Sequence, residues 1–315
     1  MERNPSVSIV VPTFNRPDEI LECVRCLEDQ DYDNLEVIIV NDGSSKSYID
    51  TEKEMSRTSS NVRYILKEHS GIVGTKNRGL QESQSEFIAF LDDDCLACSS
   101  WVRSMVHALV SEEADVAGGT LLSQKPETYV QRFSDAKKVM DKPIVDQDGN
   151  FVNIFTGNAC FRTEILQEVA GFDPLFEQHH VNAAEDVDIT YRLNAVGAKM
   201  IHVPDAIVRH KHRESLRDFI RQKFEYGRGA YFHCLLRDRS PQEIGHPDAE
   251  IGVMLKELCR YAVSEMPRRY HEFHSEHSVK DSIIFSGLGL IRRISYYSGM
   301  LSAKKKFSSV ELPQL

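Results

Sequence analysis

Residues 86–94 (EFIAFLDDD) decide how the rest of the chain is interpreted, because here an apolar run ends in three consecutive aspartates. An apolar run of this kind is typical of a strand buried on both faces of a parallel sheet. Adjacent carboxylates repel one another unless a cation lies between them. Side chains at i and i+2 of an extended segment point the same way, so we expect Asp92 and Asp94 to converge while Asp93 turns aside. The pattern predicts a Mg²⁺ or Mn²⁺ site completed by substrate phosphates, with a solvated acidic turn or a helix cap as the alternative.

The first 110 residues alternate strand and helix patterns. Apolar runs at 8–11, 35–40, 62–66 and 86–91 predict strands, and the segments between them predict helices, the first capped by Asn15. Strands that alternate with helices indicate a parallel sheet covered on both faces, which binds ligands at the carboxyl ends of its strands. Those ends carry Thr13-Phe14-Asn15, Asn41-Asp42-Gly43 and Asp92-Asp93-Asp94.

The rest of the chain gives weaker patterns. Residues 184–196 predict a helix, and short strands are expected at 199–203 and 206–210. A long helix rich in arginine and aromatic residues is expected from 215 to about 239, and shorter helices beyond 240. His210 ends the last of the expected strands, and a neutral imidazole is a usable ligand for Mn²⁺.

Composition and charge limit the function classes. The chain has 315 residues, 41% of them hydrophobic and 27% charged, which is typical of a folded protein, and its net charge is −10. The acidic balance argues against nucleic acid as a partner. From residue 268 to the end, eight basic residues stand against four acidic ones. With the apolar residues 283–291, this basic tail predicts peripheral contact with an anionic membrane, and packing or a homodimer interface is the alternative.

Several other features point to a cytoplasmic protein. No signal peptide is visible, and the apolar stretch 283–291 is too short to span a bilayer. Seven cysteines without a secretion signal predict reduced thiols.

The C-x-x-C pairs at 23–26 and 95–98 lie too far apart in sequence for a compact zinc module, so we expect them to pack in the interior. Three histidines spaced three apart at 271–277 are expected on the polar face of a helix.

Six strings in order carry a resemblance to a known family: SIVVPTFNRPDEI, VIIVNDGS, GTKNRGL, FIAFLDDD, FTGNACFR…GFDPLFE and EDVDITYRL. Together, over residues 6–212, they resemble the family 2 glycosyltransferases with the GT-A fold. The resemblance implies an α/β fold with a mostly parallel central sheet flanked by helices. It implies a catalytic domain at 1–214, with a nucleotide-binding half at about 1–111 and an acceptor half at 112–214, followed by a mainly helical extension at 215–315.

The resemblance also implies a reaction and a set of site residues. The reaction would be an inverting transfer of a sugar from a nucleotide-diphosphate donor, by default a UDP-sugar, to a hydroxyl of a glycan or lipid-linked acceptor in polysaccharide biosynthesis. A divalent cation, Mn²⁺ or Mg²⁺, would be the cofactor, held by Asp94 and His210. Asp186 matches the catalytic base, although Glu185 and Asp188 leave open which carboxylate acts. Donor contacts are implied for Pro12, Thr13, Asn15, Asp42, Lys76, Asp92 and Asp93.

One departure, one non-catalytic explanation and two alternative functions accompany this interpretation. Lys76 stands where the family usually has arginine, so the positive charge is kept but the bidentate fork is lost. Glu185 and Asp186 are also favourable first-turn acids on a helix without any catalysis. A sugar-nucleotide-forming nucleotidyltransferase would need a glycine-rich basic loop after the first strand, and PTFNRP is not one. A catalytically inactive nucleotide-sugar-binding protein is the other alternative.

Overall fold

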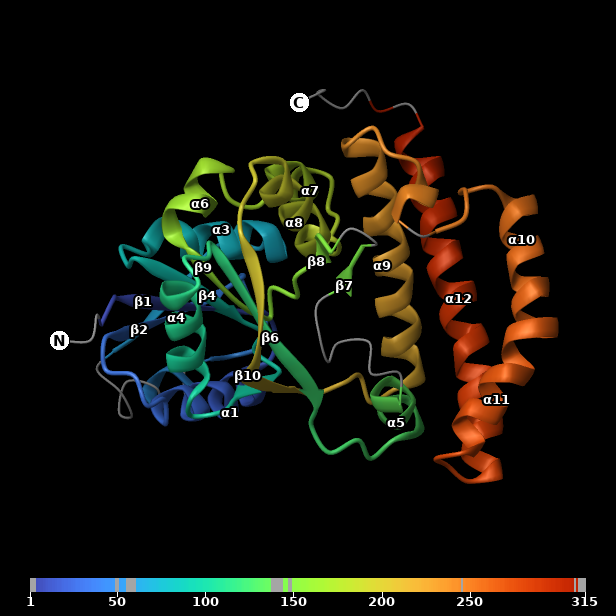
Figure 1. Cartoon of the computed structure of the whole chain (residues 1–315), viewed down its shortest axis with the longest axis horizontal. Helices are drawn as coiled ribbons and strands as arrows, with labels where there is room; N and C mark the ends of the chain where they lie inside the picture. The colour runs from blue at the N-terminus through green and yellow to red at the C-terminus, as the bar shows by residue number, and fades with distance from the viewer. Residues whose placement is uncertain are drawn as a thin grey trace. The chain divides into compact units, whose positions relative to one another are not determined.

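The computed structural model describes residues 4–48, 51–54, 61–136, 144–146, 149–244, 246–308 and 310, drawn in colour in Figure 1. These residues form two compact units. The first unit lies within Met1–Gln124, Val139–His180 and Glu185–Lys211, and the second within Lys125–Lys138, Val181–Ala184 and His212–Leu315. The units are therefore not two consecutive stretches of chain.

The first unit is built on an eight-stranded mixed sheet. Its strand order is β3-β2-β1-β4-β9-β6-β10-β5. The parallel sheet expected from the first strands is observed: β1 pairs in parallel with β2 and β4, and β2 with β3. β9 runs antiparallel between β4 and β6, and β5 runs antiparallel to β10, which makes the sheet mixed. The strands are β1 (Val7–Thr13), β2 (Leu35–Asn41), β3 (Val62–Leu66), β4 (Phe87–Leu91), β5 (Cys95–Ala97), β6 (Val116–Ser123), β9 (Asn158–Arg162) and β10 (Met200–His210).

Helices cover both faces of this sheet, as the continuous apolar strands require. Figure 1 shows α1 and α3 on opposite sides of the sheet. Alternate residues of β1 explain the arrangement: Val7, Ile9 and Val11 join one buried cluster with α1 and α4, whereas Val10 faces Gly79 of α3. The helices of this unit are α1 (Pro17–Glu28), α3 (Ile72–Glu82), α4 (Trp101–Ser111), α6 (Thr163–Glu168), α7 (Pro174–Gln178) and α8 (Glu185–Ala195), and a small hairpin pairs β7 (Ile144–Val145) with β8 (Phe151–Asn153).

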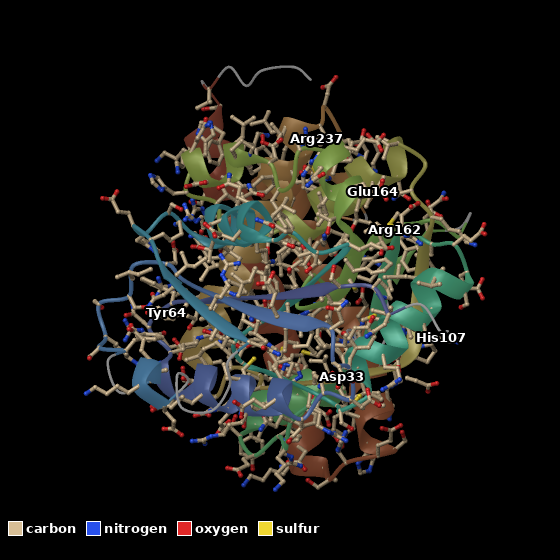
Figure 2. All side chains as sticks on the ribbon, turned by 90° about the vertical axis from the view of Figure 1, so that its left-hand side faces the viewer. Asp33, Tyr64, His107, Arg162, Glu164 and Arg237 are labelled. Atoms are coloured by element: carbon tan, nitrogen blue, oxygen red, sulfur yellow. The ribbon has the colours of Figure 1, made fainter. Side chains whose placement is uncertain are left out.

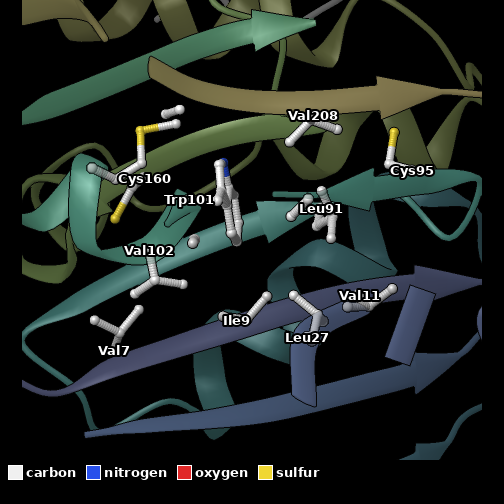
Figure 3. Close-up of a cluster of buried hydrophobic side chains, with 14 of the residues drawn as sticks. Val7, Ile9, Val11, Leu27, Leu91, Cys95, Trp101, Val102, Cys160 and Val208 are labelled. Carbon is white, nitrogen blue, oxygen red and sulfur yellow. The ribbon is translucent and has the colours of Figure 1, made fainter. Parts of the chain in front are cut away.

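The core of the first unit lies between β1, β4 and the α1–α4 pair. Figure 3 shows Trp101 and Val102 of α4 and Leu27 of α1 packed toward the strands. The first cysteine of each C-x-x-C pair, Cys23 and Cys95, is fully buried in this cluster, and the second cysteine of each pair packs against it. The interior packing expected for these cysteines is therefore observed.

The strand register brings the ends of β1, β2 and β4 to one edge of the sheet. Thr13 at the end of β1 pairs with Asn41 at the end of β2, and Val10 pairs with Phe90 of β4, two residues before Asp92. β3 lies at the end of the sheet, and its Tyr64, labelled in Figure 2, accepts a hydrogen bond from Asn41 Nδ2 at 2.5 Å.

The second unit is helical. It contains α5 (Tyr129–Ala136), α9 (Leu216–Leu236), α10 (Ile251–Arg260), α11 (Met266–His274) and α12 (Val279–Phe307), with a 3₁₀ turn at Pro241–Ile244 and a π-helical turn at Tyr261–Glu265. Two glycines bring α9 and α12 into backbone contact. A Cβ on Gly227 would lie 1.9 Å from the Tyr296 carbonyl oxygen, and a Cβ on Gly299 would lie 2.0 Å from that of Phe224. Within the described residues, no helix is both long and apolar enough to cross a membrane.

Four local predictions were wrong. Asn15 does not cap α1: it has a φ of +59°, and its Oδ1 accepts hydrogen bonds from the backbone N–H groups of Ser45 and Lys46. The two strands expected around residues 204–205 form one strand, β10, whose register shifts between Val203 and Ile207. The third histidine of the trio, His277, lies beyond α11, which ends at His274.

The fourth wrong prediction concerns α12, a helix of 29 residues where shorter helices were expected. Glycines at 287, 289 and 299 weaken the helical pattern in the sequence. Two of them are needed for close packing, because a Cβ on Gly289 would lie 2.1 Å from the Tyr261 hydroxyl and Gly299 contacts the α9 backbone.

Candidate functional site

The three aspartates follow β4 at the edge where β1, β2 and β10 also end. Asp92 and Asp94, together with Cys95, each present a ligand atom, and these three atoms lie within 4.8 Å of one another. Asp93 turns away toward Thr13, whose Oγ1 donates a hydrogen bond to Asp93 Oδ2 at 2.8 Å. The convergence of Asp92 with Asp94 expected from the i, i+2 pattern is therefore present.

A closed hydrogen-bond network fixes Asp93. Because the Thr13 hydroxyl hydrogen goes to Asp93, the Tyr48 hydroxyl, 3.0 Å away, donates to Thr13 Oγ1. The Tyr48 oxygen in turn accepts the backbone N–H of Arg16 at 2.8 Å. The Arg16 side chain completes the ring by donating to Asp93 Oδ1 at 2.7 Å. The network ties the loop after β1 to the aspartates after β4.

Arg16 also bridges two of the aspartates. Its Nη1 lies 2.7 Å from Asp93 Oδ1 and 2.7 Å from Asp94 Oδ2, and its side chain is 29% exposed. Burial raises the pKa of Asp93 to about 7 although Arg16 acts in the opposite direction. The pKa of Arg16 is raised, since its three aspartate neighbours outweigh the effect of its own burial. The Arg16 guanidinium thus offsets part of the negative charge of this cluster.

The donor set at this edge fits Mg²⁺ or Mn²⁺. Asp92 and Asp94 provide hard carboxylate oxygens, which these ions prefer. His210, the last residue of β10, places its Nε2 3.5 Å from Asp94 Oδ1 and adds an imidazole to the group. Cys95 suits such an ion poorly, because burial raises the pKa of its thiol well above the usual value and keeps it protonated. Asp92, Asp94 and His210 are thus the residues that could hold the ion.

Gly157, just before β9, provides the space in which Asp92 lies. A Cβ at this position would lie 2.6 Å from Asp92 Oδ2, so any larger residue would displace the carboxylate. Burial raises the pKa of Asp92, with Asp94 adding to the effect, while Lys76 and His210 lower it. The Asp92 carboxylate is therefore surrounded by two acids, Asp94 and Glu185, and two basic groups.

Lys76 of α3 places a buried ammonium beside this cluster. Its side chain is 2% exposed, and its Nζ contacts Glu185 Oε1 at 2.9 Å and Thr156 Oγ1 at 2.6 Å. Burial alone would lower the pKa of Lys76, but Glu185, Asp92 and Asp186 raise it overall. One ammonium thus faces acids from both the β4 end and the start of α8. Lys76, which was expected to contact the donor, therefore forms an ion pair with Glu185 within the chain.

The three acids at the start of α8 have different environments. Glu185 pairs with Lys76, and Asp188 is fully buried with its Oδ2 2.9 Å from Arg192 Nε. Asp186 accepts a hydrogen bond from the backbone N–H of Val187 at 2.8 Å and has no ion pair among the described residues. Burial, and secondly Glu185, raises the pKa of Asp186 to about 7. A carboxylate with a pKa near neutrality is suited to accepting a proton.

Asp42 and Asn15 organise the loops beside β1 and β2. Asp42 is 4% exposed, and its carboxylate oxygens accept hydrogen bonds from Lys67 Nζ at 2.6 Å and from the backbone N–H groups of Ser70 and Gly71. Asn15 holds the loop after β2 through the hydrogen bonds to residues 45 and 46. Pro12, also implied in donor binding, lies buried within β1 opposite Val40. Their side chains therefore shape the loops at this edge.

Sequence reasoning missed four of the residues that build the site. Arg16 was quoted only within the string SIVVPTFNRPDEI, and Thr156 and Gly157 only within FTGNACFR. Tyr48 was not singled out. Three consecutive aspartates indicate that positive charge lies nearby, because adjacent carboxylates repel one another. The sequence does not show, however, that residue 16 lies beside residue 94 in the fold.

Comparisons with known proteins match the chain to a family. The family model described as glycosyl transferase family 2 matches residues 8–170, which include the aspartate cluster but not Asp186 or His210. Glycosyltransferase AglE of Haloferax volcanii is 24% identical over 232 residues, covering 71% of this chain and 73% of that protein. The GalNAc(5)-diNAcBac-PP-undecaprenol beta-1,3-glucosyltransferase of Campylobacter jejuni is 28% identical over 176 residues, and the match spans only 57% of its length.

A solved structure has the same fold. The mannosyltransferase PcManGT of Pyrobaculum calidifontis, solved with GDP-Man and Mn²⁺, superposes with a TM-score of 0.61 at 15% identity, covering 98% of this chain and 89% of that one. The predicted α/β GT-A fold, with a mostly parallel sheet and C-terminal helices, is confirmed. Because the family model also covers more than half of the chain, this protein is a glycosyltransferase that belongs to glycosyl transferase family 2.

Proposed function

We propose that the chain transfers a sugar, with inversion, from a nucleotide-diphosphate donor to an acceptor hydroxyl. One observation carries the proposal: the Lys76 ammonium faces both the Asp92 side of the aspartate cluster and Asp186 at the start of α8. The aspartate cluster, which would bind the leaving diphosphate, and Asp186, which would accept the proton of the acceptor, thus both lie near the Lys76 ammonium. Inverting transfer needs these two groups on either side of the reacting carbon.

Asp186 is the proposed catalytic base. It is the first-turn acid of α8 that lacks an ion-pair partner among the described residues, whereas Glu185 and Asp188 are each held by a basic side chain. Its raised pKa lets it take the proton of an attacking hydroxyl near neutral pH. The Lys76 ammonium, 2.9 Å from Glu185 Oε1, holds that neighbouring carboxylate in place beside it.

The aspartate cluster is the proposed site of the diphosphate. A divalent cation bound there would neutralise the leaving diphosphate as a Lewis acid. Asp92, Asp94 and His210 would hold that ion. Thr13 and Arg16 hold Asp93 in its turned-aside position, and Arg16 also bonds Asp94, so its guanidinium takes part of the place that an ion would take.

The loops at the ends of β1 and β2 are the proposed nucleotide site. Pro12, Thr13 and Asn15 line the first loop, and Asp42 fixes the segment that enters α3. Phe14, 41% exposed, stacks on His69 at a centroid distance of 4.3 Å, and this ring pair is a surface on which a nucleobase could stack. UDP is the first nucleotide to test.

The acceptor is proposed to be a glycan, either free or linked to a lipid. The Campylobacter relative is named for an undecaprenol-linked acceptor, which supports the lipid-linked form. The family assignment disfavours the nucleotidyltransferase alternative. The inactive-protein alternative predicts donor binding without turnover.

A thermal-shift screen tests the proposal. The purified chain is melted with nucleoside diphosphates and nucleotide sugars, each with and without Mn²⁺, because a ligand that binds the native state raises its melting temperature. The proposal predicts a rise for one nucleotide, larger with Mn²⁺. Incubation of that donor with candidate acceptors, followed by NMR of the anomeric proton, then reports inversion. Retention of configuration, or binding without donor hydrolysis or transfer, would contradict it.

A further inference from the structure

The second unit carries an open groove of about 490 Å³ between α9 and α12. Its apolar lining comes from Ile220 and Phe224 on α9 and from Ile291 and Ile294 on α12. On each helix the lining residues follow the i, i+3, i+4, i+7 spacing of a single face. The helices touch at Gly227 and Gly299, and the groove is the space that their faces leave on one side of that contact.

Apolar surface extends beyond the groove. Ile220 is 39% exposed, Ile294 is 45% exposed, and Leu216 at the start of α9 is 44% exposed. Ile283 on α12 is 59% exposed and lies eleven residues, about three helical turns, before Ile294 on the same side of the helix. Exposed apolar side chains that gather around a groove in this way mark an interaction surface.

The groove is also strongly basic. Arg217 and Arg221 line it, one helical turn apart, and among the residues described for this unit no carboxylate lines the groove or pairs with either arginine. The acids of α9 and α12 are occupied elsewhere: the Asp218 carboxylate accepts a hydrogen bond from the Ser215 hydroxyl, Glu225 pairs with Arg228, and Asp281 pairs with Arg132. In sequence, these two helices hold ten Lys or Arg against three Asp or Glu.

We propose that this groove docks the protein on an anionic phospholipid membrane, with Arg217 and Arg221 on lipid phosphates and the isoleucines among the acyl chains. An apolar surface rimmed by arginine is the chemistry that an anionic bilayer selects. A neutral protein partner would leave both guanidinium groups without counter-charge. This surface shares Ile283 and Ile291 with the stretch that the sequence predicted for membrane contact, but its arginines lie on α9 and not near the end of the chain, and it needs neither donor nor metal.

Vesicle flotation tests the inference with the full chain. The protein is mixed with vesicles of phosphatidylcholine, or with an equal mixture of phosphatidylcholine and phosphatidylglycerol, and separated on a density gradient. We expect flotation only with the mixed vesicles and its loss at high salt, because the attraction to anionic lipid is screened. No flotation with the mixed vesicles would overturn the proposal.

Variants locate the surface. Arg217→Gln with Arg221→Gln should weaken partitioning about 25-fold, at roughly fivefold for each arginine. Ile294→Asn should weaken it about tenfold through lost apolar contact. The matched controls are Lys256→Gln with Arg268→Gln, two exposed cations on α10 and α11, and Leu66→Asn, an apolar residue that is 65% exposed on β3. Both controls should float as the unmodified protein does.

Two further results would contradict the inference. Equal flotation of the groove variants and the controls would place membrane contact elsewhere. A dimer in light scattering that Ile294→Asn converts to monomer would instead put a second copy of the chain in the groove. All of these variants alter exposed side chains, so we expect their melting curves to be unchanged. A loss of flotation without a change in melting then reports the loss of the membrane-binding surface and not unfolding.

Discussion

Replacing Lys76 with methionine removes a buried ammonium that faces both halves of the proposed site. Methionine keeps most of the volume of the side chain, so the main change is electrostatic. Glu185, whose side chain is 13% exposed, would lose its partner at 2.9 Å and remain beside Asp92 and Asp186. Breaking a buried ion pair by removing one partner costs about 3–5 kcal/mol. Because Glu185 keeps some contact with water, we expect the lower end, about 3 kcal/mol.

Scanning calorimetry measures this loss. For a domain of this size, about 3 kcal/mol corresponds to a fall in Tm of roughly 6–12 °C. The double variant Lys76→Met/Glu185→Gln should recover most of it, because no uncompensated carboxylate is then left at the pair. Lys46→Met, at an exposed lysine in the loop after β2, is the matched control and should change Tm little. A single variant as stable as the unmodified protein, or a double variant no more stable than the single, would refute the reasoning.

Three further predictions concern the site itself. Asp186→Asn should lower kcat about 10²–10⁴-fold while nucleotide affinity is unchanged, and normal turnover would exclude Asp186 as the base. Because burial raises the pKa of Asp186 to about 7 and only its ionised form accepts a proton, kcat/KM should fall about tenfold for each pH unit below 7. A profile that is flat down to pH 5 would contradict this. Arg16→Gln should tighten Mn²⁺ binding about tenfold in a spin-resonance titration, because the guanidinium that now bonds Asp93 and Asp94 is gone. Unchanged or weaker binding would show that Arg16 does not compete with the ion, and Arg25→Gln on the same helix is the control.

The parts of the fold and site that could be predicted are those that local sequence determines. The apolar strands and their polar ends follow from residue pattern, and the convergence of Asp92 with Asp94 follows from the two-residue period of an extended chain. The parallel direction of β1, β2 and β4 follows from the alternation of strands with helices, although their order in the sheet does not. These features need no knowledge of contacts between distant residues.

The rest depends on contacts between segments far apart in the chain. β9 enters the sheet antiparallel between β4 and β6, and the Gly157 position that accommodates Asp92 exists only because of that pairing. Asn15 was expected to cap a helix but instead holds the loop after β2, since a loop 30 residues away offers its backbone N–H groups. The ambiguity among Glu185, Asp186 and Asp188 could be addressed only by finding which of them is paired.

Calorimetric titration of the nucleoside diphosphate selected by the thermal screen tests the central claim most directly. The account predicts that Mn²⁺ tightens nucleotide binding to the unmodified protein, and that Asp94→Asn, which keeps the shape of the side chain but removes its charge, abolishes that tightening. Equal nucleotide affinity with Mn²⁺ and with excess chelator, or a Mn²⁺ effect that survives in Asp94→Asn, would contradict the claim that the carboxylates after β4 bind the diphosphate through an ion.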